Sequence, residues 1–166
     1  MKSALYYFLT LWIFLWLQVV SNHFLGGTVF SIQWILLAVL HFGLARGPWI
    51  GESLGFIWGL FIDASSLGLL GLHAVLYALA GFAAGMYRRQ LNISKLWTQT
   101  IFSWMATVVY FALYLVMTRF LSTGEEPFQW GILTGPVMNA ICAPVVFSAL
   151  DYWARLWEMV PEEREI

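Results

Sequence analysis

The sequence predicts an all-α integral membrane protein with six transmembrane helices. Hydrophobic residues occupy 61% of the 166 positions and charged residues only 10%, which leaves too little polar surface to cover a soluble globule of this size. Six apolar runs follow one another along the chain, separated by short segments. The formal net charge of −1, without a basic run, argues against a nucleic-acid-binding surface.

The six apolar runs cover residues 4–20, 29–45, 49–63, 69–87, 97–120 and 130–150. The first run is not followed by a small-x-small cleavage pattern, so we expect it to be a retained span rather than a signal peptide. The third run is only about 21 Å long at 1.5 Å per residue, against a hydrocarbon core of about 30 Å. It is therefore either buried within the protein or continued beyond Asp63.

Polar residues in the last two runs predict contacts between helices. In the fifth run they recur at alternating steps of three and four residues, a seam that suits packing against protein rather than lipid. This seam consists of Thr100, Ser103, Thr107, Tyr110 and Tyr114. The sixth run contains Pro136 and Pro144, which predict a bend, and Asn139, which we expect to help satisfy a carbonyl group freed by a proline.

The chain divides into a transmembrane domain, residues 1–150, and residues 151–166, a short cytoplasmic interfacial helix with an acidic tail. The interfacial helix is predicted from an apolar face formed by Trp153, Leu156, Trp157 and Val160. With six spans and a cytoplasmic N-terminus, seven of the eight Lys and Arg residues lie on the cytoplasmic side and only Arg119 lies outside. Both termini are therefore expected to be cytoplasmic.

Motifs for catalysis and metal binding are missing from the sequence. It contains no HExxH, CxxC, GxSxG or phosphate-binding glycine loop. Glu52, Asp63 and Asp151 are the only acids in or beside the runs, and Asp151 lies at a membrane face, which argues against a paired-aspartate protease. The three histidines lie on different runs or edges, where core or interfacial roles are expected. We predict no enzyme activity, catalytic residue, cofactor or metal site.

The stretch of residues 51–85 carries two surfaces of small residues. Glycine recurs every fourth residue in the third run, which places three positions without a side chain on one helical face, and a second small surface follows in the fourth run. Because such faces let backbones approach closely, we expect a packed hairpin. The candidates for helix packing or partner contact are Gly51, Gly55, Gly59, Asp63, Gly71, His73, Tyr77, Gly81 and Gly85.

Asp63 is an ionisable residue inside this apolar stretch, and the sequence allows either a structural or a functional role for it. A charge near mid-bilayer costs roughly 2.5 to 3.5 kcal/mol on insertion scales, so the carboxylate needs a partner. One reading is a helix-end carboxylate bonded to Ser65 or Ser66. The other is a functional contact, made either with a partner protein or with His73 in a protonation-dependent way.

The central stretch resembles a known family in motif detail. Arg46, Gly47 and Gly51 precede GFIWGLFID over residues 55–63 and LLGLHAVLYALAGFAAG over residues 69–85, and this succession resembles the signature of the rod-shape-determining protein MreD family. The resemblance implies a bacterial inner-membrane member of the cell-elongation machinery that works with MreC, the actin-like MreB, and RodA with its class B penicillin-binding protein. It also implies a fold similar to the substrate-binding component of energy-coupling-factor vitamin transporters.

Two functions follow as expectations. The first is a non-enzymatic membrane scaffold that binds an MreC-like protein and is linked to peptidoglycan synthesis and cell shape, because short loops and small-residue or polar faces offer mainly helix surfaces for binding. The alternative is a vitamin-binding membrane component of a transporter, in which Asp63, His73 and Asn139 converge on an outward-facing pocket.

Overall fold

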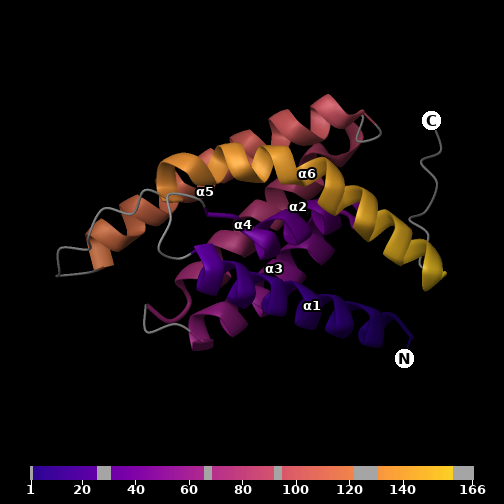
Figure 1. The fold of residues 1–166 in the computed structure, drawn as a ribbon, viewed down its shortest axis with the longest axis horizontal. Helices are drawn as coiled ribbons and strands as arrows, with labels where there is room; N and C mark the ends of the chain where they lie inside the picture. The colour runs from indigo at the N-terminus through magenta and orange to yellow at the C-terminus, as the bar shows by residue number, and fades with distance from the viewer. Residues whose placement is uncertain (1, 26–30, 66–68, 92–94, 122–130, 159–166) are drawn as a thin grey trace.

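The computed structural model describes residues 2–25, 31–65, 69–91, 95–121 and 131–158 (Figure 1). These residues form α1 (Lys2–Leu25), α2 (Trp34–Arg46), α3 (Pro48–Ser65), α4 (Leu72–Met86), the 3₁₀ helix η1 (Tyr87–Arg89), α5 (Leu96–Leu121) and α6 (Gly131–Leu156). No strand occurs within these ranges. The predicted all-α class with six α-helices is confirmed for the described part of the chain.

Three of the described helices are long and apolar enough to cross a membrane. They are α1 over Lys2–Phe24, α5 and α6. The apolar helix α2 has only 13 residues, or about 20 Å of helix against a hydrocarbon core of about 30 Å. The structure therefore supports a membrane protein, while the number of spans stays a prediction.

The short helix α2 lies at the centre of the molecule. Every residue from Ile35 to Leu44 is buried, and α2 contacts α1, α3, α4 and α6. A helix that is apolar on all sides needs to be surrounded either by lipid or by other parts of the protein. The neighbours of α2 therefore replace lipid around it, which explains why a helix shorter than the bilayer core is tolerated.

Helices α3 and α4 pack antiparallel along the small residues that the sequence marks. A Cβ atom at Gly51, Gly55 or Gly59 would lie less than 3.0 Å from backbone atoms of α4, and one at Gly81 or Gly85 would meet the backbone of α3 in the same way. The backbones thus touch directly because no side chain separates them. Both glycine surfaces are used inside the chain.

A glycine that the sequence analysis did not select extends this contact to the central helix. A Cβ at Gly43 of α2 would meet the backbone oxygen of Gly81 and lie 3.0 Å from the Cβ of Ala84. Gly43 precedes Gly47 and Gly51 at the same four-residue spacing, which is the signal that could have revealed it. Helices α2, α3 and α4 therefore meet at one point made of small residues.

Helix α6 is continuous although it contains Pro136 and Pro144, and it follows a curved course across the molecule (Figure 1). It runs to Leu156 without a break at residue 151, so the boundary between a transmembrane domain and an interfacial helix stays a prediction.

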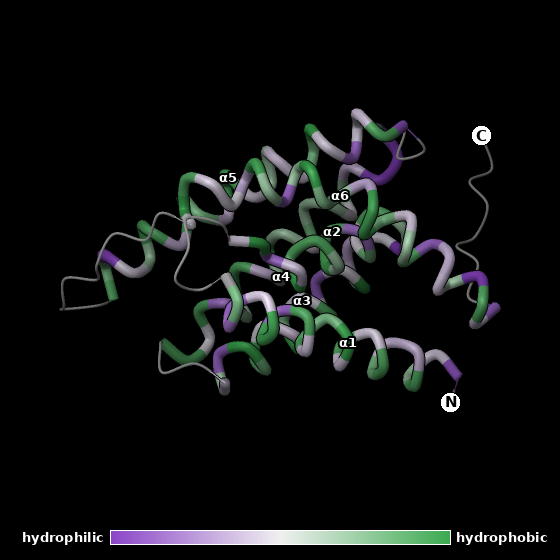
Figure 2. Tube along the Cα trace, viewed as in Figure 1, coloured by the Kyte–Doolittle hydropathy of each residue, from purple (hydrophilic) through white to green (hydrophobic). Residues whose placement is uncertain are grey.

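The start of α1 and the end of α6 lie at the same end of the molecule, where Lys2 Nζ is 3.6 Å from Glu158 Oε2. Figure 2 shows hydrophilic residues at both of these helix ends.

The glycine contact predicts the effect of a bulky residue on α3. Gly59→Leu should force α3 away from Ala74 and lower the free energy of unfolding by about 1 to 3 kcal/mol through overpacking. Ala64→Leu introduces the same side chain at an exposed position of the same helix and should have little effect. Membrane abundance and the melting temperature in detergent measure both variants. Equal abundance and melting temperature in the two variants would contradict a packed glycine face.

Candidate functional site

Asp63, near the end of α3, has a fully buried side chain that binds the start of α4. Its Oδ2 accepts hydrogen bonds from the backbone N–H groups of Gly71 (3.0 Å) and Ala74 (3.1 Å). Its Oδ1 accepts one from the backbone N–H of His73 at 3.1 Å and lies 2.7 Å from His73 Nδ1. The side chain of Asp63 has no exposed surface, whereas 21% of the His73 side chain is exposed.

This arrangement is a helix cap supplied by a neighbouring helix. The first N–H groups of a helix have no partner within it, and they carry the positive end of the helix dipole. A capping carboxylate normally belongs to the residue just before the helix, but that position in α4 is Gly71, which has no side chain and a φ of 92°. Gly71 permits the tight entry into α4, and Asp63 provides the acceptors that the local sequence lacks.

The partners of Asp63 differ in part from the expected ones. The hydroxyl of Ser65 donates to the backbone oxygen of Phe61 at 2.7 Å, and Ser66 lies outside the described residues. The expected contact with His73 is present at 2.7 Å, while its dependence on protonation stays a prediction. Which of these two atoms donates depends on the tautomer of His73, since an ionised carboxylate can only accept.

An aromatic chain connects His73 to α5. The His73 ring lies 5.9 Å from the ring of Tyr77 and 5.7 Å from that of Tyr114, measured between centroids. Tyr77 stacks on Tyr110 at 5.5 Å. Tyr110 and Tyr114 belong to the polar seam predicted in the fifth apolar run, so one end of that seam packs on the side chains of α4.

The start of α2 is capped by side chains from two other helices. Gln18 of α1 accepts from the backbone N–H of Trp34 at 2.9 Å and donates to the backbone oxygen of Ile32 at 3.0 Å. Asn139 of α6 accepts from the backbone N–H of Gln33 at 2.9 Å and donates to Thr107 of α5 at 3.1 Å. The expectation that Asn139 satisfies a carbonyl freed by a proline is therefore replaced by a role in capping α2.

The residues that cap α2 and α4 are connected to one another and form one polar layer. Each of the six α-helices, or the segment just before it, contributes at least one residue to this layer. The connection is the hydroxyl of Tyr77, which donates to Gln33 Oε1 at 3.4 Å. The layer consists of Gln18, Gln33, Asp63, His73, Tyr77, Thr107, Tyr110, Tyr114 and Asn139. Sequence reasoning missed Gln18 and Gln33, although a polar side chain in or beside an apolar run is the same signal that drew attention to Asp63.

The nine predicted candidates lie in one continuous region along α3 and α4. Five of them are the glycines of the direct helix contact, while Gly71, Asp63, His73 and Tyr77 belong to the capped start of α4 and the polar layer. Whether any of them contacts a partner stays a prediction.

His41 is buried away from the polar layer, and its Nε2 lies 3.4 Å from Asp151 Oδ1. In the described residues, no three His, Cys, Asp or Glu side chains form a group that could hold a metal ion.

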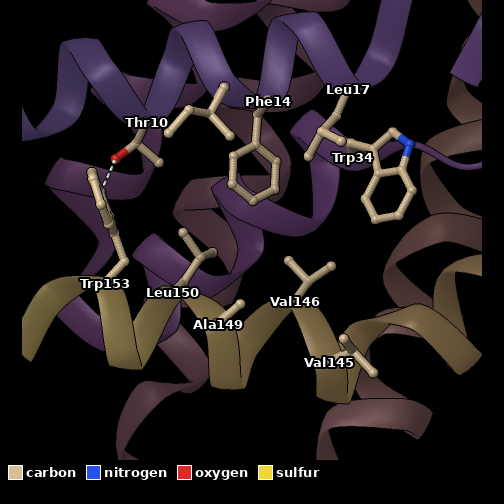
Figure 3. A pocket seen from close by; sticks show the side chains of 10 residues that line it. Thr10, Phe14, Leu17, Trp34, Val145, Val146, Ala149, Leu150 and Trp153 are labelled. Atoms are coloured by element: carbon tan, nitrogen blue, oxygen red, sulfur yellow. Dashed lines mark hydrogen bonds between the residues drawn. The ribbon is translucent and has the colours of Figure 1, made fainter. Parts of the chain in front are cut away.

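A cavity among the described helices lies apart from Asp63 and His73, the ionisable residues of the polar layer. It lies between α1 and α6, has a volume of about 300 Å³, and is lined almost entirely by apolar side chains (Figure 3). Asp63, His73 and Asn139 are engaged with helix starts and neighbouring side chains instead.

These features define a small helical membrane protein whose polar side chains hold its own helices together. The chain belongs to the rod shape-determining protein MreD family, whose model matches residues 1–152. Membership implies a role in determining rod shape, in a family of shape-determining membrane proteins that is not a known enzyme family. Neither a curated protein nor a solved structure matches the chain. The predicted family is confirmed, and the likeness to vitamin-transporter components stays a prediction.

The double acceptor role of Asp63 predicts the effect of its amide analogue. In Asp63→Asn one oxygen is replaced by an NH₂ group that faces N–H donors, so we expect a loss of about 1 to 3 kcal/mol in the free energy of unfolding. Hydrogen exchange should accelerate at the amides of Gly71, His73 and Ala74. Glu158→Gln is the control, because that side chain is 82% exposed. Unchanged exchange and melting temperature in Asp63→Asn would rule out the capping role.

Proposed function

We propose that this chain is a non-enzymatic scaffold of the bacterial cell-elongation complex that binds an MreC-like membrane protein. Through that partner it is linked to MreB, RodA and a class B penicillin-binding protein, and so to peptidoglycan synthesis and cell shape. The family match supports the shape-determining part of this proposal.

One structural observation carries the scaffold proposal. The glycine faces are used between α3 and α4, and the polar layer is used to cap α2 and α4. What the described helices offer to other molecules is therefore chiefly their outward apolar surface, as in α3, where Phe56, Ile57 and Leu60 are exposed. Helix surfaces of this kind bind other membrane helices through van der Waals packing.

The vitamin-binding alternative is less well supported by the same geometry. A binding pocket needs a few polar groups that converge on a cavity. Asp63 and Asn139 instead direct their acceptors at backbone N–H groups of α4 and of Gln33. The cavity between α1 and α6 is apolar and offers little to orient a polar ligand.

The scaffold proposal predicts both a cellular and a biochemical result. Depletion of this chain in a rod-shaped host should give rounded cells, and its re-expression should restore rods. A tagged copy purified from membranes should recover the MreC-like protein, whereas an unrelated tagged six-helix membrane protein should not. Unchanged rods after depletion, or a stoichiometric bound vitamin without the MreC-like protein, would contradict it.

A second prediction concerns orientation in the bacterial inner membrane. We infer six spans with both termini in the cytoplasm, because seven of eight basic residues then lie inside. The shared location of the start of α1 and the end of α6 agrees with this orientation. Reporter fusions at Gly47 and Gln90 should read as cytoplasmic, and a fusion after Arg119 should read as external. An external reading at Gly47 or Gln90 would refute the topology.

A further inference from the structure

A group of basic side chains without acidic partners lies just beyond the end of α4. Arg88 and Arg89 belong to η1, which follows α4 directly, and Lys95 comes immediately before α5. Arg88 is half-buried, whereas Arg89 and Lys95 are exposed. Among the described residues, none of these three side chains is ion-paired with an acid. We call Arg88, Arg89 and Lys95 the basic patch.

The guanidinium of Arg88 lies against the turn between α2 and α3. Gly47 joins these two helices with a φ of 102°, and a Cβ atom added to it would lie 3.6 Å from Arg88 Nη1. A Cβ added to Gly85 would meet the backbone of Gly47 and Pro48, so the end of α4 packs directly on this turn. Backbone contacts, rather than an acidic side chain, therefore place Arg88 beside the turn.

The positive charge of the basic patch exceeds what the neighbouring helix ends require. The end of α4 carries roughly half a negative charge, and the end of α2 carries a similar charge that Arg46 in its last turn offsets. Glu52 is the acid that α2, α3, α4, η1 and α5 carry at this end of the molecule. Against three basic side chains, these contributions leave a surplus of roughly one and a half positive charges. An anion is therefore the partner that this patch favours.

Exposed aromatic and apolar side chains place the basic patch at the level of lipid headgroups. Trp49 is 74% exposed and Tyr87 is 50% exposed, and such rings gather at membrane–water interfaces. Along α4, Val75, Leu79 and Met86 are exposed and lie on one face of the helix, because they are spaced by four and seven residues. An apolar face therefore leads along α4 to the basic patch.

We propose that the basic patch binds the phosphate of an anionic phospholipid headgroup. The planar guanidinium of Arg88 donates hydrogen bonds to the phosphate oxygens, and Arg89 and Lys95 attract the net negative charge of the headgroup. The acyl chains lie along the apolar face of α4. A zwitterionic lipid binds less well, because its amine offsets the charge of its phosphate. This inference is independent of the scaffold function, since it concerns the contact of one helix end with lipid.

Native mass spectrometry of the purified full-length protein tests the proposal. The protein in detergent is mixed with equal amounts of phosphatidylglycerol and phosphatidylethanolamine, and the lipids that stay bound are counted. We expect several-fold more phosphatidylglycerol than phosphatidylethanolamine, and Arg88→Gln should lower this preference several-fold. Arg119→Gln is the matched control, because it removes the same charge from an exposed arginine in the last turn of α5 and should leave the preference unchanged.

A second variant keeps the test informative if Arg88→Gln does not fold. The double variant Arg89→Gln, Lys95→Gln leaves the contact of Arg88 with the Gly47 turn in place, and it should also lower the preference for phosphatidylglycerol. Equal retention of the two lipids, or a preference that both variants leave unchanged, would overturn the proposal.

Two further outcomes would assign the basic patch to a different anion. Displacement of phosphatidylglycerol by millimolar inorganic phosphate, but not by chloride of the same ionic strength, would overturn the proposal in favour of a free-phosphate site. Carbodiimide crosslinks between Lys95 and the acidic residues 161–166 would overturn it as well, because this segment of the chain would then cover the patch.

Discussion

The starts of α2 and α4 are partly buried against neighbouring helices, and their first N–H groups need hydrogen-bond acceptors there. A helix leaves these groups without internal partners, and an unpaired buried group costs about 1 to 3 kcal/mol. At α4 the acceptor is the carboxylate of Asp63, and at α2 the acceptors are the amide oxygens of Gln18 and Asn139. Each cap also joins separate helices, so one local requirement determines much of the tertiary arrangement.

The cap on α4 depends on the glycine contact that precedes it along α3. Gly51, Gly55 and Gly59 allow the backbones of α3 and α4 to touch at successive turns. Asp63 follows Gly59 by four residues, so it continues the same face and reaches the first N–H groups of α4. Close backbone approach and a short side chain are both needed, because a wider separation would leave the carboxylate short of its donors.

The polar and small residues of the described helices contact other helices of the same chain, and this limits which surfaces remain for other molecules. In the described helices, the side chains that first suggest chemistry, such as Asp63, His73 and Asn139, contribute to cohesion of the fold. The described helices of this member of the MreD family present apolar outer surfaces. Contacts of such surfaces within a membrane depend on shape and dispersion more than on directed polar groups.

Much of the α3–α4 region could be predicted from the sequence, because its signals are local. Four-residue spacing of glycine indicates a shared face, and an acid within an apolar run indicates a need for a partner. The partners themselves were not predictable to the same degree. Gln18 and Asn139 lie 16 and 106 residues from the backbone groups that they cap, and no periodicity in the sequence relates positions that far apart.

The sequence by itself determined that this is an apolar helical protein of the MreD family type, with a close hairpin at residues 51–85 and a buried acid that requires donors. Only the tertiary structure decided that α2 is enclosed on all sides, that Gly43 joins the glycine contact, and that Asp63 caps α4. The physical reason is that hydropathy and spacing report which faces avoid water. They do not report which neighbouring helix covers a given face in a chain where nearly every face is apolar.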